Sequence, residues 1–122
     1  MTDKKQSILA VLTKPPYGGT TAKEALDAVL TAAAFEVPVS VLFMDDAVFQ
    51  LLPEQKTEGI EVKCLATTLP VLPMYDVEHI YVDRKALVDR GIDAEQLILS
   101  VQPVETDTLR SLFQNHSRIL SF

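Results

Sequence analysis

The chain holds one residue that could act as a strong nucleophile. Cys64 is its only cysteine, and a thiolate beside a cation can attack a substrate or carry sulfur. Lys63 is the one cation next to it, and the flanking Val62 and Leu65 are ordinary apolar residues. Because a buried cysteine usually behaves as a small hydrophobic side chain, the sequence favours a packing role over a catalytic one. A single cysteine also excludes an internal disulfide and is typical of a reducing compartment.

Three aspartates follow apolar runs and could group their carboxylates. Asp45, Asp46 and Asp83 are arranged somewhat like the acidic pocket of a phospho-receiver, which holds a divalent cation. In a receiver, however, the acidic pair follows the first strand, where this chain has Thr13 and Lys14. Each aspartate also precedes an apolar helical stretch, and aspartate is a preferred helix N-cap. Helix capping is therefore the favoured interpretation of all three.

The segment from Lys14 to Thr21 joins an apolar run to a helical pattern and contains two glycines. Such a loop at a helix N-terminus could bind an anion such as phosphate or a nucleotide. Pro15 and Pro16 remove two backbone donors that an anion would need. We expect a structural turn here and keep a small anion-binding module as the less favoured alternative.

The two histidines do not form a metal-binding pattern. His79 and His116 are far apart in the sequence and lack the close spacing of metal-ligand pairs. Structural roles are expected for both, and the sequence indicates neither a metal nor a cofactor.

Alternating apolar runs define the elements that must position these residues. Strands are expected at residues 7–13, 37–43, 79–82, 97–101 and 118–122, the first with the continuous apolar pattern of a strand buried on both faces. Helices are expected at 22–34, over a short stretch carrying residues 48–52, at 83–91 and at 105–115. In the last of these, Leu109, Leu112 and Phe113 should point inward. Residues 60–75 favour a strand or loop followed by a short helix.

This alternation predicts one α/β domain spanning residues 1–122, a three-layer fold with a mostly parallel five-stranded sheet and helices on both faces. In such sheets ligands bind beyond the carboxyl ends of the strands. The loops that matter should therefore begin at Thr13, Met44, Asp83 and Gln102.

The composition limits the classes of partner. Of 122 residues, 48% are hydrophobic, and 11 basic against 17 acidic residues give a net charge of −6. That charge repels phosphate backbones, so we expect no direct contact with nucleic acid. No apolar run approaches the roughly 20 residues of a membrane helix, and no signal peptide is evident, so a cytoplasmic protein with no membrane contact is expected.

Apolar residues are more abundant than a small core requires in two places. They crowd the short helix at 48–52 and the proline-punctuated segment 69–75. An exposed apolar patch of this size usually marks a protein interface. We expect such an interface at Phe49, Leu52, Leu72 and Tyr75; the alternative, that the two segments pack on each other, stays open.

Four stretches, at residues 14–28, 41–55, 75–78 and 81–93, resemble the DsrE/DsrF-like family of sulfur-relay proteins over nearly the whole chain. The Phe-Gln-Leu-Leu-Pro sequence at 49–53 is similar to the TusC-like branch of the family, with the DsrF-like branch next. The resemblance implies a heterohexamer of three homologous subunits in two copies each. It would pass persulfide sulfur through a downstream acceptor protein toward 2-thiolation of the tRNA wobble uridine.

The resemblance also implies where chemistry should and should not lie. The partners would be TusB-like and TusD-like subunits, or DsrH-like and DsrE-like subunits in a complex for sulfur oxidation. In the family, the sulfur-accepting cysteine of one partner follows a strand and precedes a helix that ends in glycine. Counting back from Gly91, that position here is Asp83, which cannot carry a persulfide. A structural subunit without catalytic residues is therefore expected, with a persulfide carrier using Cys64 as the alternative.

Overall fold

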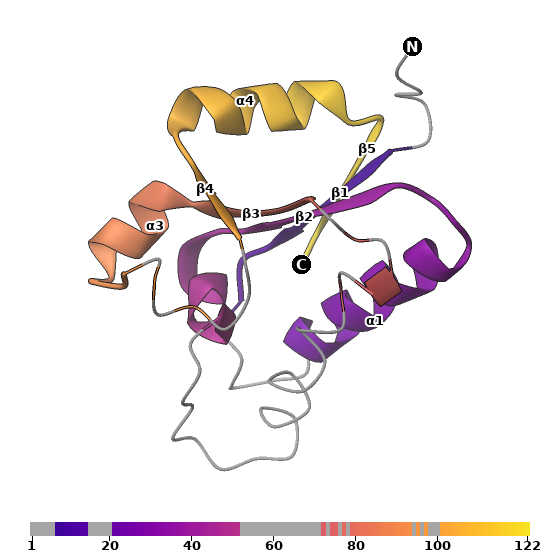
Figure 1. Ribbon diagram of the computed structural model, residues 1–122, viewed down its shortest axis with the longest axis horizontal. Coiled ribbons are helices and arrows are strands. Elements are labelled where there is room, and N and C mark those ends of the chain that lie inside the picture. The colour runs from indigo at the N-terminus through magenta and orange to yellow at the C-terminus, as the bar shows by residue number, and fades with distance from the viewer. Residues whose placement is uncertain are drawn as a thin grey trace.

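The computed structural model (Figure 1) describes residues 7–14, 21–51, 72, 74, 75, 77, 79–93, 95, 97 and 101–122. Its centre is a five-stranded sheet in the order β4-β3-β2-β1-β5. The strands are β1 (Ile8–Leu12), β2 (Val39–Phe43), β3 (His79–Asp83), β4 (Gln102–Val104) and β5 (Arg118–Ser121). All four pairings between neighbours are parallel. The predicted α/β class and five-stranded sheet are confirmed, and the sheet is parallel throughout.

Helices cover both faces of this sheet. Helix α4 (Thr106–Asn115) lies over one face and α1 (Thr21–Ala34) over the other, as Figure 1 shows. The 3-10 helix η2 (Asp45–Leu51) and the short α3 (Arg84–Asp89) contribute buried side chains to the same core cluster as α1. The three-layer arrangement expected from the alternation of apolar runs is therefore present.

The pleat of the strands divides the apolar side chains between two cores. Along β1, Ala10 and Leu12 belong to the cluster beneath α1, whereas Leu9 and Val11 belong to the cluster beneath α4. Successive side chains of a strand point to opposite faces, so a strand covered on both faces must be apolar at every position. This explains why β1 reads as an uninterrupted apolar run.

Helix α3 begins and ends at the residues that the sequence indicated. Asp83 is its N-cap, and Gly91 follows its C-cap with φ of 66°. The amides of Gly91 and Ile92 donate to the carbonyls of Val88 and Leu87, at 3.1 and 2.9 Å. These paired bonds form a Schellman motif, whose left-handed residue is usually glycine.

Two expectations about the C-terminal third require correction. The fourth strand was expected at residues 97–101, but β4 spans Gln102–Val104; Leu97 and Val101 instead pack against the core beneath α1. Because β4 lies at the sheet edge, Pro103 is tolerated despite lacking an amide hydrogen. Phe113 was expected to point inward and is 38% exposed, since the narrow inner face of α4 is filled by Leu109 and Leu112.

None of the described helices has the length and apolar character that crossing a membrane requires.

The burial of Leu72 yields a test of this core. None of its surface is exposed, whereas Met74, two residues later, is 81% exposed. Leu72→Ala should lower the free energy of unfolding by about 2–5 kcal/mol, because it leaves a cavity in the core beneath α1. The matched change Met74→Ala should stay within about 0.5 kcal/mol of the parent. Chemical denaturation measures both, and equal stability of the two variants would contradict the placement of Leu72.

Candidate functional site

The carboxyl edge of the sheet is where a parallel α/β fold places its chemistry. Thr13, Met44 and Asp83 stand at the ends of β1, β2 and β3, as expected. The fourth loop begins at Glu105 and not at Gln102, because β4 ends at Val104. Backbone bonds hold this edge together: the Met44 amide donates to the Leu12 carbonyl at 2.9 Å.

Asp83 closes β3 and is committed to a structural bond. Its side chain is 9% exposed, and its carboxylate accepts a hydrogen bond from the Lys85 amide at 3.2 Å. That amide is one of the free donors of the first turn of α3, which an N-cap side chain normally satisfies. The favoured interpretation of Asp83 as a helix cap is confirmed.

The capping expected of Asp45 and Asp46 is corrected: both lie within the first turn of η2, and no cap bond joins either to a described residue. Asp46 pairs with Arg90, whose Nη2 and Nε lie 3.0 and 3.1 Å from the same carboxylate oxygen. Arg90 is the C-cap of α3 and also donates to the Ala86 carbonyl at 3.3 Å. The pair joins the start of η2 to the end of α3. Asp45 has φ of 49°, a left-handed conformation that aspartate tolerates better than most residues.

A second ion pair lies nearby on the surface. The Nη1 atom of Arg84 is 3.3 Å from a carboxylate oxygen of Glu105, and both side chains are well exposed. Solvent screening leaves such a pair little effect on stability. This pair lies at the ends of β3 and β4, whereas the Arg90–Asp46 pair lies at the other end of α3 from Asp83.

Gln50 is a buried polar residue that the sequence analysis did not single out. It is 2% exposed, and its Nε2 donates to the carbonyl of Lys14 at 2.9 Å. Its Oε1 has no hydrogen-bond partner among the residues described here. The bond ties η2 to the start of the loop after β1. The only sequence signal was an amide side chain between apolar neighbours on a short helix.

The histidines lie away from this edge, on the sheet face that α4 partly covers. His79 stacks on Tyr81, with ring centroids 6.4 Å apart. His116 lies 2.7 Å from the Leu112 carbonyl through Nδ1 and 3.2 Å from the Ser40 hydroxyl through Nε2. Within the described ranges, His, Cys, Asp and Glu side chains form no group of three or more that could hold a metal ion.

The expected interface residues differ in how much of their surface is exposed. Tyr75 is 45% exposed, and Phe49 is partly buried on η2. Leu72 lies wholly in the core and cannot meet a partner in this conformation, so its inclusion in the expected interface is corrected. Its apolar character serves the core beneath α1. Leu52, Cys64 and residues 15–20, on which other expectations rest, lie outside the described residues.

Comparison with known proteins places the chain among others of similar length. It is 38% identical to the Protein TusC homolog of Pseudomonas aeruginosa, covering 95% of this chain and 98% of that protein. It is 44% identical to the intracellular sulfur oxidation protein DsrF of Allochromatium vinosum, over 77% of this chain and 70% of that protein.

A solved structure and a family profile also match this chain. The crystal structure of the ychN protein from E. coli superposes with a TM-score of 0.80 at 24% identity, covering 96% of this chain and 99% of that one. At that identity the likeness shows the fold. The profile of the DsrE/DsrF-like family matches residues 6–122. With a relative of 38% identity along almost its full length, the chain belongs to the DsrE/DsrF-like family.

Proposed function

We propose that this chain is a non-catalytic structural subunit of a cytoplasmic sulfur-relay heterohexamer of the TusBCD type. The complex transfers persulfide sulfur for 2-thiolation of the tRNA wobble uridine. The observation that carries the proposal is the aspartate at the end of β3, in a chain 38% identical to a TusC homologue. Asp83 stands where the family resemblance puts the sulfur-accepting cysteine of another subunit.

The chemistry of Asp83 supports a structural role. A persulfide needs a sulfur atom, and a carboxylate has none to offer. The carboxylate of Asp83 caps α3, so the side chain at this position supports the start of a helix and offers no sulfur nucleophile. A nearby negative charge also disfavours the thiolate form of a cysteine. The sulfur-carrying residue therefore belongs to a homologous partner.

The surface of the chain supports a role in assembly. Tyr75 remains available for an interface on the evidence of its exposure, and Phe49 on η2 is only partly buried. The net charge of −6 opposes direct contact with tRNA. We therefore assign RNA contact to the downstream acceptor protein, and subunit contact to this chain.

A second candidate is a DsrF-type subunit of a DsrEFH-type complex for sulfur oxidation. It is supported by the 44% identity to DsrF. The two candidates share the same structural role and differ in the acceptor of the sulfur. A third candidate, a persulfide carrier using Cys64, is tested by loading the purified chain with sulfur and releasing thiocyanate with cyanide. Release that Cys64→Ser abolishes would support it.

Isolation of the protein from its own cells under native conditions tests the assembly. The tagged chain should return with two α/β partners of similar size, in a mass that corresponds to two copies of each. One partner should carry a cysteine at the position equivalent to Asp83. Native mass spectrometry gives the stoichiometry, and peptide sequencing identifies the partners. Recovery of the chain alone at endogenous expression levels would contradict the proposal.

Substitution of Asp83 separates capping from catalysis. Asp83→Ala should lower the free energy of unfolding by about 1 kcal/mol, because the Lys85 amide loses its acceptor. Asp83→Ser, which retains an N-cap oxygen, should stay close to the parent. The complex reconstituted with Asp83→Ser should transfer sulfur at the parental rate. A stable, assembled Asp83→Ser complex that no longer transfers sulfur would show that the carboxylate takes part in the chemistry.

A further inference from the structure

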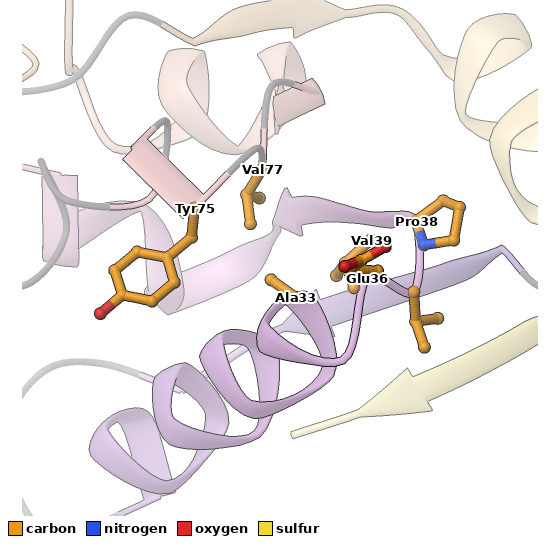
Figure 2. A pocket seen from close by; sticks show the side chains of 7 residues that line it. Ala33, Glu36, Pro38, Val39, Tyr75 and Val77 are labelled. Carbon is orange, nitrogen blue, oxygen red and sulfur yellow. The ribbon is translucent and has the colours of Figure 1, made fainter.

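The amino end of the sheet, opposite Asp83, carries a hollow of about 390 Å³. Its walls come from the end of α1, the start of β2 and the segment before β3, as Figure 2 shows. The side chains that the argument uses are those of Ala33, Glu36, Val39, Tyr75 and Val77. Strand β3 runs from this end of the sheet to Asp83. The hollow and Asp83 therefore lie at opposite ends of the strands.

Glu36 holds an unusual backbone conformation at this hollow. Its φ is 64°, and it follows the last turn of α1. The Glu36 amide donates to the Ala33 carbonyl at 2.9 Å, and the Val37 amide donates to the Ala32 carbonyl at 3.1 Å. These bonds form the same Schellman motif that ends α3, where the left-handed residue is Gly91. Helix α1 thus has a glutamate where α3 has the preferred glycine.

Glutamate makes this helix end less stable than glycine would. A residue with a Cβ is disfavoured in the left-handed region relative to glycine. Its carboxylate makes no hydrogen bond or ion pair with any residue in the described part of the chain, and its side chain is exposed. Backbone strain that folding does not require is commonly found at functional positions. The carboxylate is therefore accessible to a charged group from outside the chain.

The electrostatics of the hollow favour a cation. The carbonyl end of a helix carries a partial negative charge, and α1 has no basic residue in its last turn. The Glu36 carboxylate adds a full negative charge at the same place. No lysine or arginine is among the residues that line the hollow. Two negative features thus lie together without a compensating charge from the described walls.

One aromatic residue lines the hollow, and two large apolar residues adjoin its lining residues in the sequence. Tyr75 lines it and is 45% exposed; in Figure 2 its hydroxyl points away from Glu36 and Pro38. Its sequence neighbour Met74 is 81% exposed, and Phe35, next to Glu36, is 78% exposed. Where exposed apolar side chains gather in one patch, they mark a surface that another protein covers. A bare metal ion or a free polyamine would leave them in water.

We propose that this hollow receives an arginine side chain from a partner subunit, paired with the Glu36 carboxylate and lying against the Tyr75 ring. The exposed Phe35 and Met74 are covered by apolar neighbours of that arginine. Arginine fits better than lysine because its planar guanidinium can pair with a carboxylate and stack on an aromatic ring. The existence of the partner rests on the proposed function, and the hollow itself does not.

Assembly with the co-expressed homologous subunits tests the proposal. Glu36→Lys should weaken association by about tenfold or more, because it opposes the incoming arginine with a like charge. Glu95→Lys, the same charge change at an exposed position outside the hollow, is the matched control and should leave the affinity within about twofold. Tyr75→Phe keeps the ring and should assemble as the parent does, whereas Tyr75→Ala should not. Parental affinity for Glu36→Lys would overturn the proposal and leave the structural-subunit function standing.

Glu36→Gly separates binding from folding. It should raise the melting temperature of the isolated chain, because glycine relieves the left-handed strain, and should weaken assembly at the same time. A variant that is more stable and yet assembles poorly cannot be explained by misfolding. A lowered melting temperature would show that the carboxylate supports the fold itself and would overturn the proposal.

Butylguanidinium tests the hollow without any partner. Titrated into the isolated chain, it should shift the amide resonances of Glu36, Val39 and Val77 in a saturable manner, and Glu36→Gln should abolish the shifts. Identical shifts in the parent and in Glu36→Gln would overturn the proposal, whether or not the complex forms. If the parent chain binds butylguanidinium but no homologous subunit, the hexamer proposal fails and the cation site stands.

Discussion

Burial of the central strands on both faces is the constraint on which the rest of this structure depends. β1 and β2 lie in the middle of the sheet with a neighbour on either side, so their backbone groups bond to other strands. Their side chains contact α1 and η2 on one face and, at alternate positions, α4 on the other. Such strands tolerate almost no polar residue. Polar side chains that could bind or react therefore lie at the two ends of the strands.

At the carboxyl edge, β3 leads directly into α3, and Asp83 at the junction has no sulfur atom to offer. Asp83 leaves β3 and immediately caps α3. The paired Arg90 and Asp46 hold the far end of α3 against η2. Hydrogen bonds and one partly buried charge pair thus connect the elements of this edge, and its described residues include no thiol.

The two Schellman motifs show how one local geometry can serve different purposes. After α3, Gly91 takes the left-handed conformation without strain and simply ends the helix. After α1, Glu36 takes nearly the same φ with an exposed side chain, at a hollow that Tyr75 also lines. Local stability would favour glycine at both places. Our proposal accounts for the glutamate after α1, because an arginine of a partner subunit pairs with it in the assembly.

Local sequence determined much of this protein. The apolar runs of β1, β2 and β3, the N-cap at Asp83 and the glycine after α3 depend on residues only a few positions apart, so they could be predicted within a residue or two. The parallel sheet followed from the alternation of strands and helices, because a parallel connection needs a crossover.

Tertiary structure decided the rest. Whether Leu72 or Tyr75 would be buried depended on what each meets across the fold, because both lie in the same proline-punctuated segment. The position of β4 depended on which residues pair with β3 in the folded sheet. Phe113 is exposed because Leu109 and Leu112 fill the face of α4 that contacts the sheet. The hollow beside Glu36 joins residues nearly forty positions apart. No pattern along the chain could reveal it, because Glu36 and Tyr75 come to line one hollow only after the sheet has formed.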